Sequence, residues 1–292
     1  MPYRFRGETR VLDAAARQGV PGGFVTLAEG VTHYELGGPA DAQPVVLVHG
    51  FSVPYYIWDP TFAGLTAAGL RVLRYDLYGR GYSDRPETEY TLALFGRQLL
   101  GLLDAVGLTR PVDVVGLSMG GPVAVTFTDL HPQRVRRLAL LDPAGLPFPT
   151  PALKNLIRLP WLGERLLDRF FESQMVNSQG KDFVHPERFP NFRPSYLPQT
   201  HFFGFRRAIL STIRGDVLRD QTAAFRRVGQ QGRPTLLIWG RHDKTIPFPT
   251  HEKVLAAIPH AEFHAIDDAG HVPHYERPEV VNPLLIAFLR KQ

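Results

Sequence analysis

A single serine stands between glycines in the sequence VDVVGLSMGGPVAV, residues 112–125. Ser118 follows an apolar run typical of a buried strand and precedes apolar sequence typical of a helix. A tight turn between them strains the backbone at the serine and requires small residues two positions away, which Gly116 and Gly120 supply. The turn would expose the hydroxyl near helix amides that favour negative charge. Ser118 is therefore a candidate nucleophile, which needs an adjacent base oriented by an acid.

The elements expected around Ser118 are short apolar or β-branched runs, most of them separated by longer segments with helical spacing. The runs are GFVTLAEG, VTHYELG, PVVLVHG, RVLRYDL, VDVVGLS, RRLALLDPAG, PTLLIWG and AEFHAID. Strands that alternate with helices predict a mainly parallel α/β sheet, whose reactive groups gather at the carboxyl ends of the strands. Because few residues separate the first two runs around Gly30, we expect an antiparallel hairpin at one edge.

The alternation breaks between about residues 144 and 228, where the sequence indicates helices and loops without a strand. We predict a helical cap over 144–228, inserted between a first part of the core at 1–143 and a second part at 229–292. The cap is rich in aromatic residues: Phe148, Trp161, Phe170, Phe171, Phe202, Phe203 and Phe205. A cap of this composition over a site predicts an apolar pocket.

Composition excludes several classes of protein. The 292 residues are 44% hydrophobic and 21% charged, which is typical of a globular chain. The absence of cysteine excludes disulfides, thiolate zinc sites and a cysteine nucleophile. The net charge of +5 rests on scattered arginines and predicts no nucleic-acid partner. No run approaches the roughly 18 apolar residues of a membrane span, and the first residues lack a signal sequence, so we expect a cytoplasmic protein without membrane contact.

Two further kinds of site are disfavoured by spacing. Histidines and aspartates are common in the loops, but no H-E-x-x-H or similar ligand spacing occurs, so we predict no metal. The stretch YDLYGRGYSDRP, residues 75–86, has Gly79-x-Gly81 without a third glycine or a Walker lysine. We interpret it as a structural turn and expect no cofactor.

The pattern Gly116-x-Ser118-x-Gly120, between a strand and a helix, resembles the nucleophile elbow of the α/β-hydrolase fold superfamily. The resemblance runs from about Phe24 to the C-terminus. It implies an α/β fold with a mostly parallel eight-stranded sheet, flanking helices and an inserted helical cap.

This superfamily places its site residues in the order serine, acid, histidine. The resemblance therefore implies His271, in DDAGHVPHYERPE, as the base and Asp243, in LLIWGRHDKTIP, as the acid. Asp142, at the end of the sixth strand, and Asp268, close to His271, are rival acids.

The stretch LVHGFS resembles the His-Gly turn of the same superfamily, which implies the Phe51 and Met119 N–H groups as oxyanion donors. We interpret His49 as a structural histidine that bonds to local backbone, and interpret His33, His242 and His274 in the same way. The residues expected to line the substrate pocket are Gly50, Trp58, Leu146, Phe202, Phe203 and Val272.

Relatives within the superfamily suggest several reactions. Haloalkane dehalogenases and epoxide hydrolases resemble the chain in fold but have an aspartate where Ser118 stands. Carbon–carbon bond hydrolases of aromatic ring-cleavage products share the Ser-Met-Gly-Gly pattern but usually have asparagine in place of Leu117. Cofactor-free haloperoxidases and perhydrolases also resemble this pattern, with an aromatic residue where Phe51 stands.

We expect a serine hydrolase that cleaves carboxylic esters of small to medium apolar acyl or aryl groups. Its partners are then a small-molecule ester and water. Two alternatives stay open: carbon–carbon hydrolysis, and a receptor-like member that only binds a small molecule. Neither the physiological ester nor the oligomeric state follows from the motifs.

Overall fold

Eight strands form one sheet in the computed structural model, which describes residues 3–149, 156–177 and 179–291. The strands are β1 (Gly23–Leu27), β2 (Gly30–Gly37), β3 (Pro44–Val48), β4 (Arg71–Tyr75), β5 (Val112–Leu117), β6 (Val135–Leu141), β7 (Thr235–Gly240) and β8 (Glu262–Ile266). Their spatial order is β1-β2-β4-β3-β5-β6-β7-β8. β1 pairs with β2, and β2 with β4, in antiparallel fashion, whereas the other neighbours are parallel. The predicted edge hairpin and mostly parallel eight-stranded sheet are confirmed.

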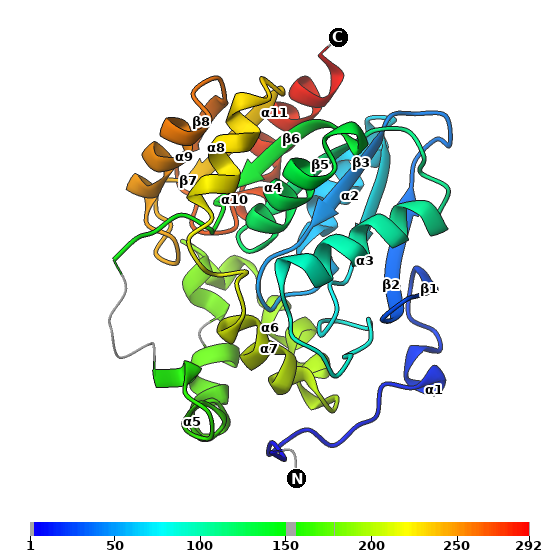
Figure 1. The fold of residues 1–292 in the computed structure, drawn as a ribbon, viewed down its shortest axis with the longest axis vertical. Helices are drawn as coiled ribbons and strands as arrows, with labels where there is room; N and C mark the ends of the chain where they lie inside the picture. Colours follow the sequence, from blue (N-terminus) through cyan, green and yellow to red (C-terminus); the bar gives the residue numbers. More distant parts are fainter. Residues whose placement is uncertain (1–2, 150–155, 178, 292) are drawn as a thin grey trace.

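Helices cover both faces of this sheet (Figure 1). The helices outside the region between β6 and β7 are α1 (Ala14–Arg17), α2 (Asp59–Ala67), α3 (Leu92–Ala105), α4 (Gly120–Leu130), α9 (His251–Ala257), α10 (Pro273–Glu276) and α11 (Pro278–Arg290). One core cluster joins the sheet to α3, α4 and α9, and another joins it to α2 and α11. Because both faces are covered, every residue of β5 is buried, which explains its nearly continuous apolar run.

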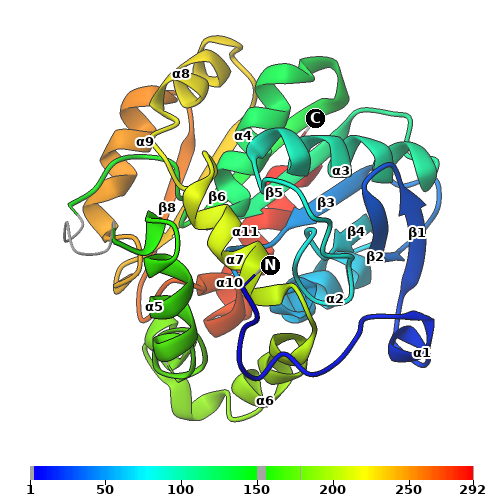
Figure 2. The same ribbon diagram turned by 60° about the horizontal axis from the view of Figure 1, so that its bottom comes forward.

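The segment between β6 and β7 forms α5 (Leu162–Phe171), α6 (Phe192–Tyr196), α7 (Phe205–Arg214) and α8 (Thr222–Gln230), with shorter turns among them. In Figure 1, α5, α6 and α7 gather at one end of the molecule near the N-terminus, and Figure 2 brings this end forward. They share an apolar cluster with Phe5 from the N-terminal segment. We call the segment from α5 to α7, with the turns between these helices, the cap.

The last helix of the predicted cap lies elsewhere. α8 packs beside α4, and its residues Ala224, Phe225 and Val228 belong to the core cluster on that face of the sheet. The cap therefore ends before Thr222, earlier than the predicted boundary at residue 228. The polar and apolar spacing of α8 suits a core crossover helix as well as a cap helix, so sequence pattern could not separate the two.

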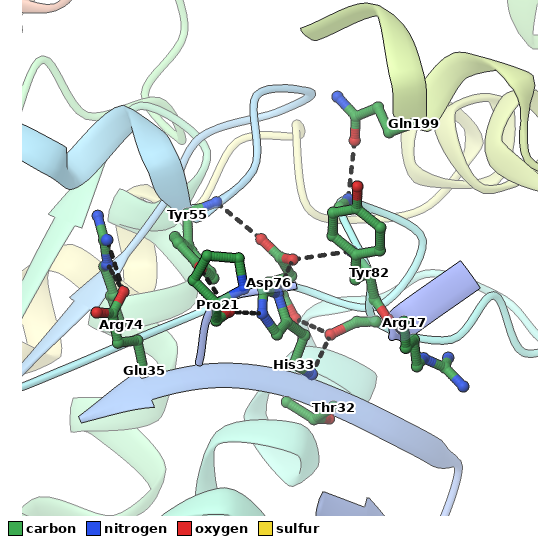
Figure 3. A network of polar contacts seen from close by, with 12 residues as sticks. Arg17, Pro21, Thr32, His33, Glu35, Tyr55, Arg74, Asp76, Tyr82 and Gln199 are labelled. Atoms are coloured by element: carbon green, nitrogen blue, oxygen red, sulfur yellow. Dashed lines mark hydrogen bonds and ion pairs between the residues drawn. The ribbon is translucent and has the colours of Figure 1, made fainter. Parts of the chain in front are cut away.

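The glycine-containing loop after β4 is a structural turn around Asp76. The carboxylate of Asp76 accepts hydrogen bonds from the backbone N–H groups of Tyr55 and Tyr82, at 2.8 and 2.9 Å, and lies 2.7 Å from His33 Nδ1 (Figure 3). Gly81 has φ +51°, and a Cβ there would lie 2.0 Å from Asp76 Oδ2. Glycine is required because the loop wraps closely around this buried carboxylate.

Candidate active site

Ser118 lies between the end of β5 and the start of α4, in a left-handed backbone conformation with φ +52°. A non-glycine residue pays a steric cost there and needs support from its surroundings. Its N–H donates to the Leu141 carbonyl on the neighbouring strand at 2.9 Å. A Cβ at Gly116 would lie 2.4 Å from the Gly120 carbonyl oxygen, and a Cβ at Gly120 would lie 2.2 Å from that of Val48. Only glycine therefore fits on either side of this turn.

The structure brings the three predicted residues of the site together. His271 Nε2 lies 2.8 Å from Ser118 Oγ, and His271 Nδ1 lies 2.8 Å from Asp243 Oδ2. In the neutral imidazole, Nδ1–H donates to the carboxylate, which leaves Nε2 free to accept the serine proton. The other oxygen of Asp243 accepts the N–H groups of Thr245 and Ile246 at 2.8 and 2.9 Å, so the carboxylate is held from both sides.

Burial and neighbouring charge act on His271 in opposite directions. Desolvation lowers the pKa of the imidazole, but the charge and hydrogen bond of Asp243, together with the charge of Asp182, outweigh it and raise the pKa overall. Asp182 belongs to the cap segment, and its carbonyl accepts the His271 N–H at 2.8 Å. Sequence reasoning missed Asp182, because nothing in its local pattern places it beside a histidine 89 residues later.

The two rival acids occupy different surroundings. Asp142 is fully buried, and its Oδ1 accepts the Gly240 N–H at 2.9 Å. Burial, reinforced by the charge of Asp243, raises the pKa of Asp142 well above its ordinary value. Asp268 lies at the surface and pairs with His185 at 2.9 Å. Asp243 is thus the carboxylate that hydrogen-bonds to His271 Nδ1.

Ligating atoms of Asp142, Asp243 and His271 lie within 4.8 Å of one another, a grouping that also suits a metal ion. The carboxylate of Asp243 and Nδ1 of His271 already hydrogen-bond to each other, however. These metal-ligating atoms are therefore already used in the hydrogen-bonded chain that ends at Ser118. The burial of Asp142 favours its neutral form, which is a weaker metal ligand.

The turn after β3 lies directly against Ser118. A Cβ at Gly50 would be 3.3 Å from the Ser118 Cβ, so glycine permits this close approach. The backbone N–H groups of Phe51 and Met119 have no acceptor among the described residues, which leaves both available to an oxyanion. His49 is fully buried: its Nε2 accepts the Leu77 N–H at 2.9 Å and its Nδ1–H donates to the Gly50 carbonyl at 2.9 Å.

These partners explain the chemistry of His49. Desolvation by burial lowers the pKa of the imidazole to about 4, so His49 is neutral at physiological pH. Both of its ring nitrogens are used by the backbone, and it holds the turn that contains Gly50 in place.

A cavity of about 250 Å³ opens at Ser118 and His271. The core side contributes Gly50, Phe51, Ser52, Val53, Ile57, Leu117 and Val272, and the segment around the cap contributes Gln174, Met175, Gln179, Lys181, Asp182 and Phe192. Thr245 completes the lining. The wall beside Ser118 is mainly hydrocarbon, whereas the cap side adds polar groups.

Four expected pocket residues do not line this cavity. Trp58 is fully buried with its ring centroid 4.4 Å from that of His274, and Leu146 belongs to the core cluster that includes α4. Phe202 is also buried and packs against Arg10 and Arg85, whereas Phe203 is 40% exposed. The aromatic composition of this segment predicted an apolar pocket but could not tell which of the aromatic residues face Ser118.

The sequence model of the alpha/beta hydrolase fold matches residues 43–278. The chain belongs to this hydrolase family. Two curated relatives are each 30% identical to it. One is a 2-hydroxymuconate semialdehyde hydrolase from Pseudomonas putida, aligned over 84% of this chain and 86% of its own. The other is a 2-hydroxy-6-oxononadienedioate/2-hydroxy-6-oxononatrienedioate hydrolase from Cupriavidus pinatubonensis, aligned over 91% and 94%.

A solved structure of similar fold is the malate-bound thermophilic esterase from Thermogutta terrifontis. It is 28% identical to this hydrolase, covers 92% of this chain and 98% of its own, and superposes with a TM-score of 0.75. Among the described helices of this hydrolase, none has the length and apolar character needed to cross a bilayer. The family and the hydrolase names of both relatives support hydrolase activity for this chain.

Proposed function

We propose that this hydrolase cleaves carboxylic esters with small to medium apolar acyl or aryl groups through an acyl-enzyme at Ser118. The observation that carries the proposal is the hydrogen-bonded chain from Ser118 through His271 to Asp243, with 2.8 Å at each link, at the floor of a partly apolar cavity. Such a chain supplies a nucleophile, its base and the group that orients the base.

The reaction begins when Ser118 Oγ attacks the ester carbonyl carbon and its proton moves to His271 Nε2. The N–H groups of Phe51 and Met119 stabilise the negative oxygen of the tetrahedral intermediate. The imidazolium, stabilised by Asp243, then donates its proton to the departing alkoxide. Water attacks the acyl-enzyme with His271 as base, the acid is released and Ser118 regains its proton.

The lining of the cavity supports an apolar group next to the scissile bond. Val53, Ile57 and Leu117 contribute only hydrocarbon, and a volume of about 250 Å³ suits a short acyl chain or a single ring. The esterase from Thermogutta terrifontis, a structural neighbour, is an enzyme of this class.

Hydrolysis of a carbon–carbon bond in ring-cleavage products is the second candidate, favoured by the names of the two curated relatives. The leaving group of that reaction is a carbon instead of an alkoxide oxygen. The negative charge that develops on it needs stabilisation beyond the two oxyanion donors. Leu117 lines the cavity at the position where such enzymes usually have asparagine, and its side chain has no polar atom. This feature favours the ester.

The test is hydrolysis of p-nitrophenyl esters from acetate to long acyl chains, beside a 2-hydroxy-6-oxo-dienoate ring-cleavage product. We expect ester turnover by the wild type and a loss of at least about 10³-fold in Ser118→Ala. Ring-cleavage turnover at a kcat/KM far above that of every ester would favour the second candidate. Equal ester turnover by wild type and a folded Ser118→Ala variant would overturn the serine mechanism for both.

A further inference from the structure

Arg80 carries a fully buried guanidinium group in the loop between β4 and α3. Each of its three nitrogens donates a hydrogen bond: Nε to the Phe51 carbonyl at 2.8 Å, Nη1 to the Tyr78 carbonyl at 3.1 Å, and Nη2 to Thr212 Oγ1 at 2.9 Å. Thr212 belongs to α7 of the cap. One side chain therefore joins three parts of the molecule: residues 50–52, which we call the oxyanion turn, its own loop and the cap.

The surroundings of Arg80 do not neutralise its charge. No carboxylate forms an ion pair with it within the described ranges, and the rings of Phe51, Tyr90 and Phe95 lie 5.7 to 5.9 Å from the guanidinium carbon. Burial lowers the pKa of Arg80 to about 10, so the group stays protonated at neutral pH. Burying a charge without a counter-charge is costly. We therefore look for the role of Arg80 in its three hydrogen bonds.

A second cap residue holds the next carbonyl of the same turn. Gln199 lies in the turn Leu197–His201 that precedes α7. Its Nε2 donates to the Ser52 carbonyl at 2.9 Å, and its Oε1 accepts the Gly81 N–H at 2.8 Å. Figure 3 shows Gln199 reaching from the cap segment down to the loop that contains Tyr82. Consecutive carbonyls, those of Phe51 and Ser52, are thus both tied to buried side chains.

We propose that Arg80 is a positioning residue that orients the Phe51 backbone for oxyanion binding. Together with Gln199, it links this orientation to the position of the cap. The inference rests on the proposed role of the Phe51 N–H. Backbone donors stabilise an oxyanion only when they are already aimed at it. His49 holds the Gly50 carbonyl on one side of Phe51. Arg80 and Gln199 hold the Phe51 and Ser52 carbonyls on the other side.

The choice of arginine has a geometric reason. A planar guanidinium can donate to acceptors in three different parts of the chain. A lysine ammonium is a compact point charge on a shorter side chain and cannot donate to all three. Arg80→Lys keeps the charge but abandons this geometry. It therefore separates orientation of the turn from a simple electrostatic effect of a nearby cation.

The experiment compares Arg80→Lys with wild type in ester turnover and in binding of an aryl trifluoromethyl ketone. In the adduct, Ser118 Oγ bonds to the ketone carbon, its proton passes to His271 and the ketone oxygen becomes the oxyanion. We expect kcat to fall by roughly tenfold or more with KM changed less than about threefold, because the lost stabilisation belongs to the transition state. Affinity for the ketone should fall by a similar factor, while affinity for a matched ether without a carbonyl should not.

Arg85→Lys is the matched control, since Arg85 belongs to the same loop but donates to the Ser83 and Gly81 carbonyls instead of the oxyanion turn. We expect its kcat to stay within about twofold of wild type. Gln199→Glu serves if Arg80→Lys does not fold: it keeps the acceptor for the Gly81 N–H, loses the donor to Ser52, and should also lower kcat without raising KM.

A folded Arg80→Lys variant with kcat and ketone affinity within twofold of wild type would overturn the proposal. So would an equal loss in Arg85→Lys, because the effect would then be a general one of the loop. Failure of the ester assignment is distinguished by the ketone, since the loss of ketone affinity in Arg80→Lys does not depend on which substrate the hydrolase turns over.

Discussion

His271 Nε2 lies 2.8 Å from Ser118 Oγ, although 153 residues separate the two in the sequence. The parallel sheet produces this contact, because β5 and β8 both end at the edge where the loops of Ser118 and His271 emerge. Asp243, after β7, reaches the same edge and completes the chain. The predictions that follow test how each part of this arrangement contributes.

The two buried aspartates should respond differently to amide substitution. Asp243→Asn removes the charge that orients and stabilises the His271 imidazolium, so kcat should fall by about 10⁴-fold. Asp142→Asn should keep kcat within a few-fold of wild type, because burial already favours the uncharged acid and asparagine has nearly its shape. Steady-state kinetics of both purified variants make the comparison, and the opposite ranking would reassign the acid to Asp142.

The pH profile should report the raised pKa of His271. Desolvation is outweighed by Asp243 and Asp182, so the imidazole keeps its proton to a higher pH than its ordinary pKa of 6.5. Only the neutral imidazole can accept the Ser118 proton, so kcat/KM should rise with pH through a midpoint above 6.5.

Asp182→Asn removes one of the two charges that raise this pKa, so it should move the midpoint to lower pH. The profile is measured from pH 5 to 9 at substrate concentrations well below KM. Lys181→Gln is the control from the same segment, since Lys181 is not one of the groups that shift the pKa of His271. A midpoint below that of free imidazole in the wild type would contradict the charge relationship.

Gly120→Ala should destabilise the fold and abolish turnover. Its Cβ would lie 2.2 Å from the Val48 carbonyl oxygen and 2.7 Å from that of His49, so the backbone of β3 or α4 must shift. We expect a loss of at least about 2 kcal/mol in the free energy of unfolding, measured by urea denaturation.

The control for this prediction is Gly96→Ala in α3, where a Cβ meets no atom within 4 Å. There alanine should raise stability by about 0.5–1 kcal/mol through its better helix propensity. If the two variants were equally stable, the tight packing of the elbow against β3 would not be what requires glycine at Gly120.

Acyl-chain preference should respond to Ile57 and not to Phe202. Ile57→Ala enlarges the cavity wall, so the preferred p-nitrophenyl ester should become longer. Phe202→Leu alters buried packing away from the cavity and should lower stability by about 1 kcal/mol with the chain-length profile unchanged. The full ester series is measured on both variants. A shift of the chain-length preference in Phe202→Leu alone would show that Phe202 lines the substrate pocket.

Much of the fold and the nucleophile turn could be predicted from the sequence because their signals are local. Each strand is a short apolar or β-branched run, and burial on both faces makes that run visible without a structure. The spacing of Gly116, Ser118 and Gly120 indicates the turn locally, and the close contact at Gly116 is with Gly120 itself. The close contact at Gly120 is with the Val48 and His49 carbonyls, which the local spacing does not show. The order of serine, acid and histidine along the chain follows in turn from the order of the strands.

Only the tertiary structure decided which distant side chains meet. The cavity lining, the contact of Arg80 with Thr212 and the contacts of Asp182 and Gln199 depend on how the segment from α5 to α7 folds back over the core. An aromatic residue at helical spacing has the same local pattern whether it faces the cavity or the cap interior, and Phe202 faced the interior. Hydrogen bonds between segments more than 100 residues apart have no local signature, because the backbone between them sets the distance and the sequence pattern does not.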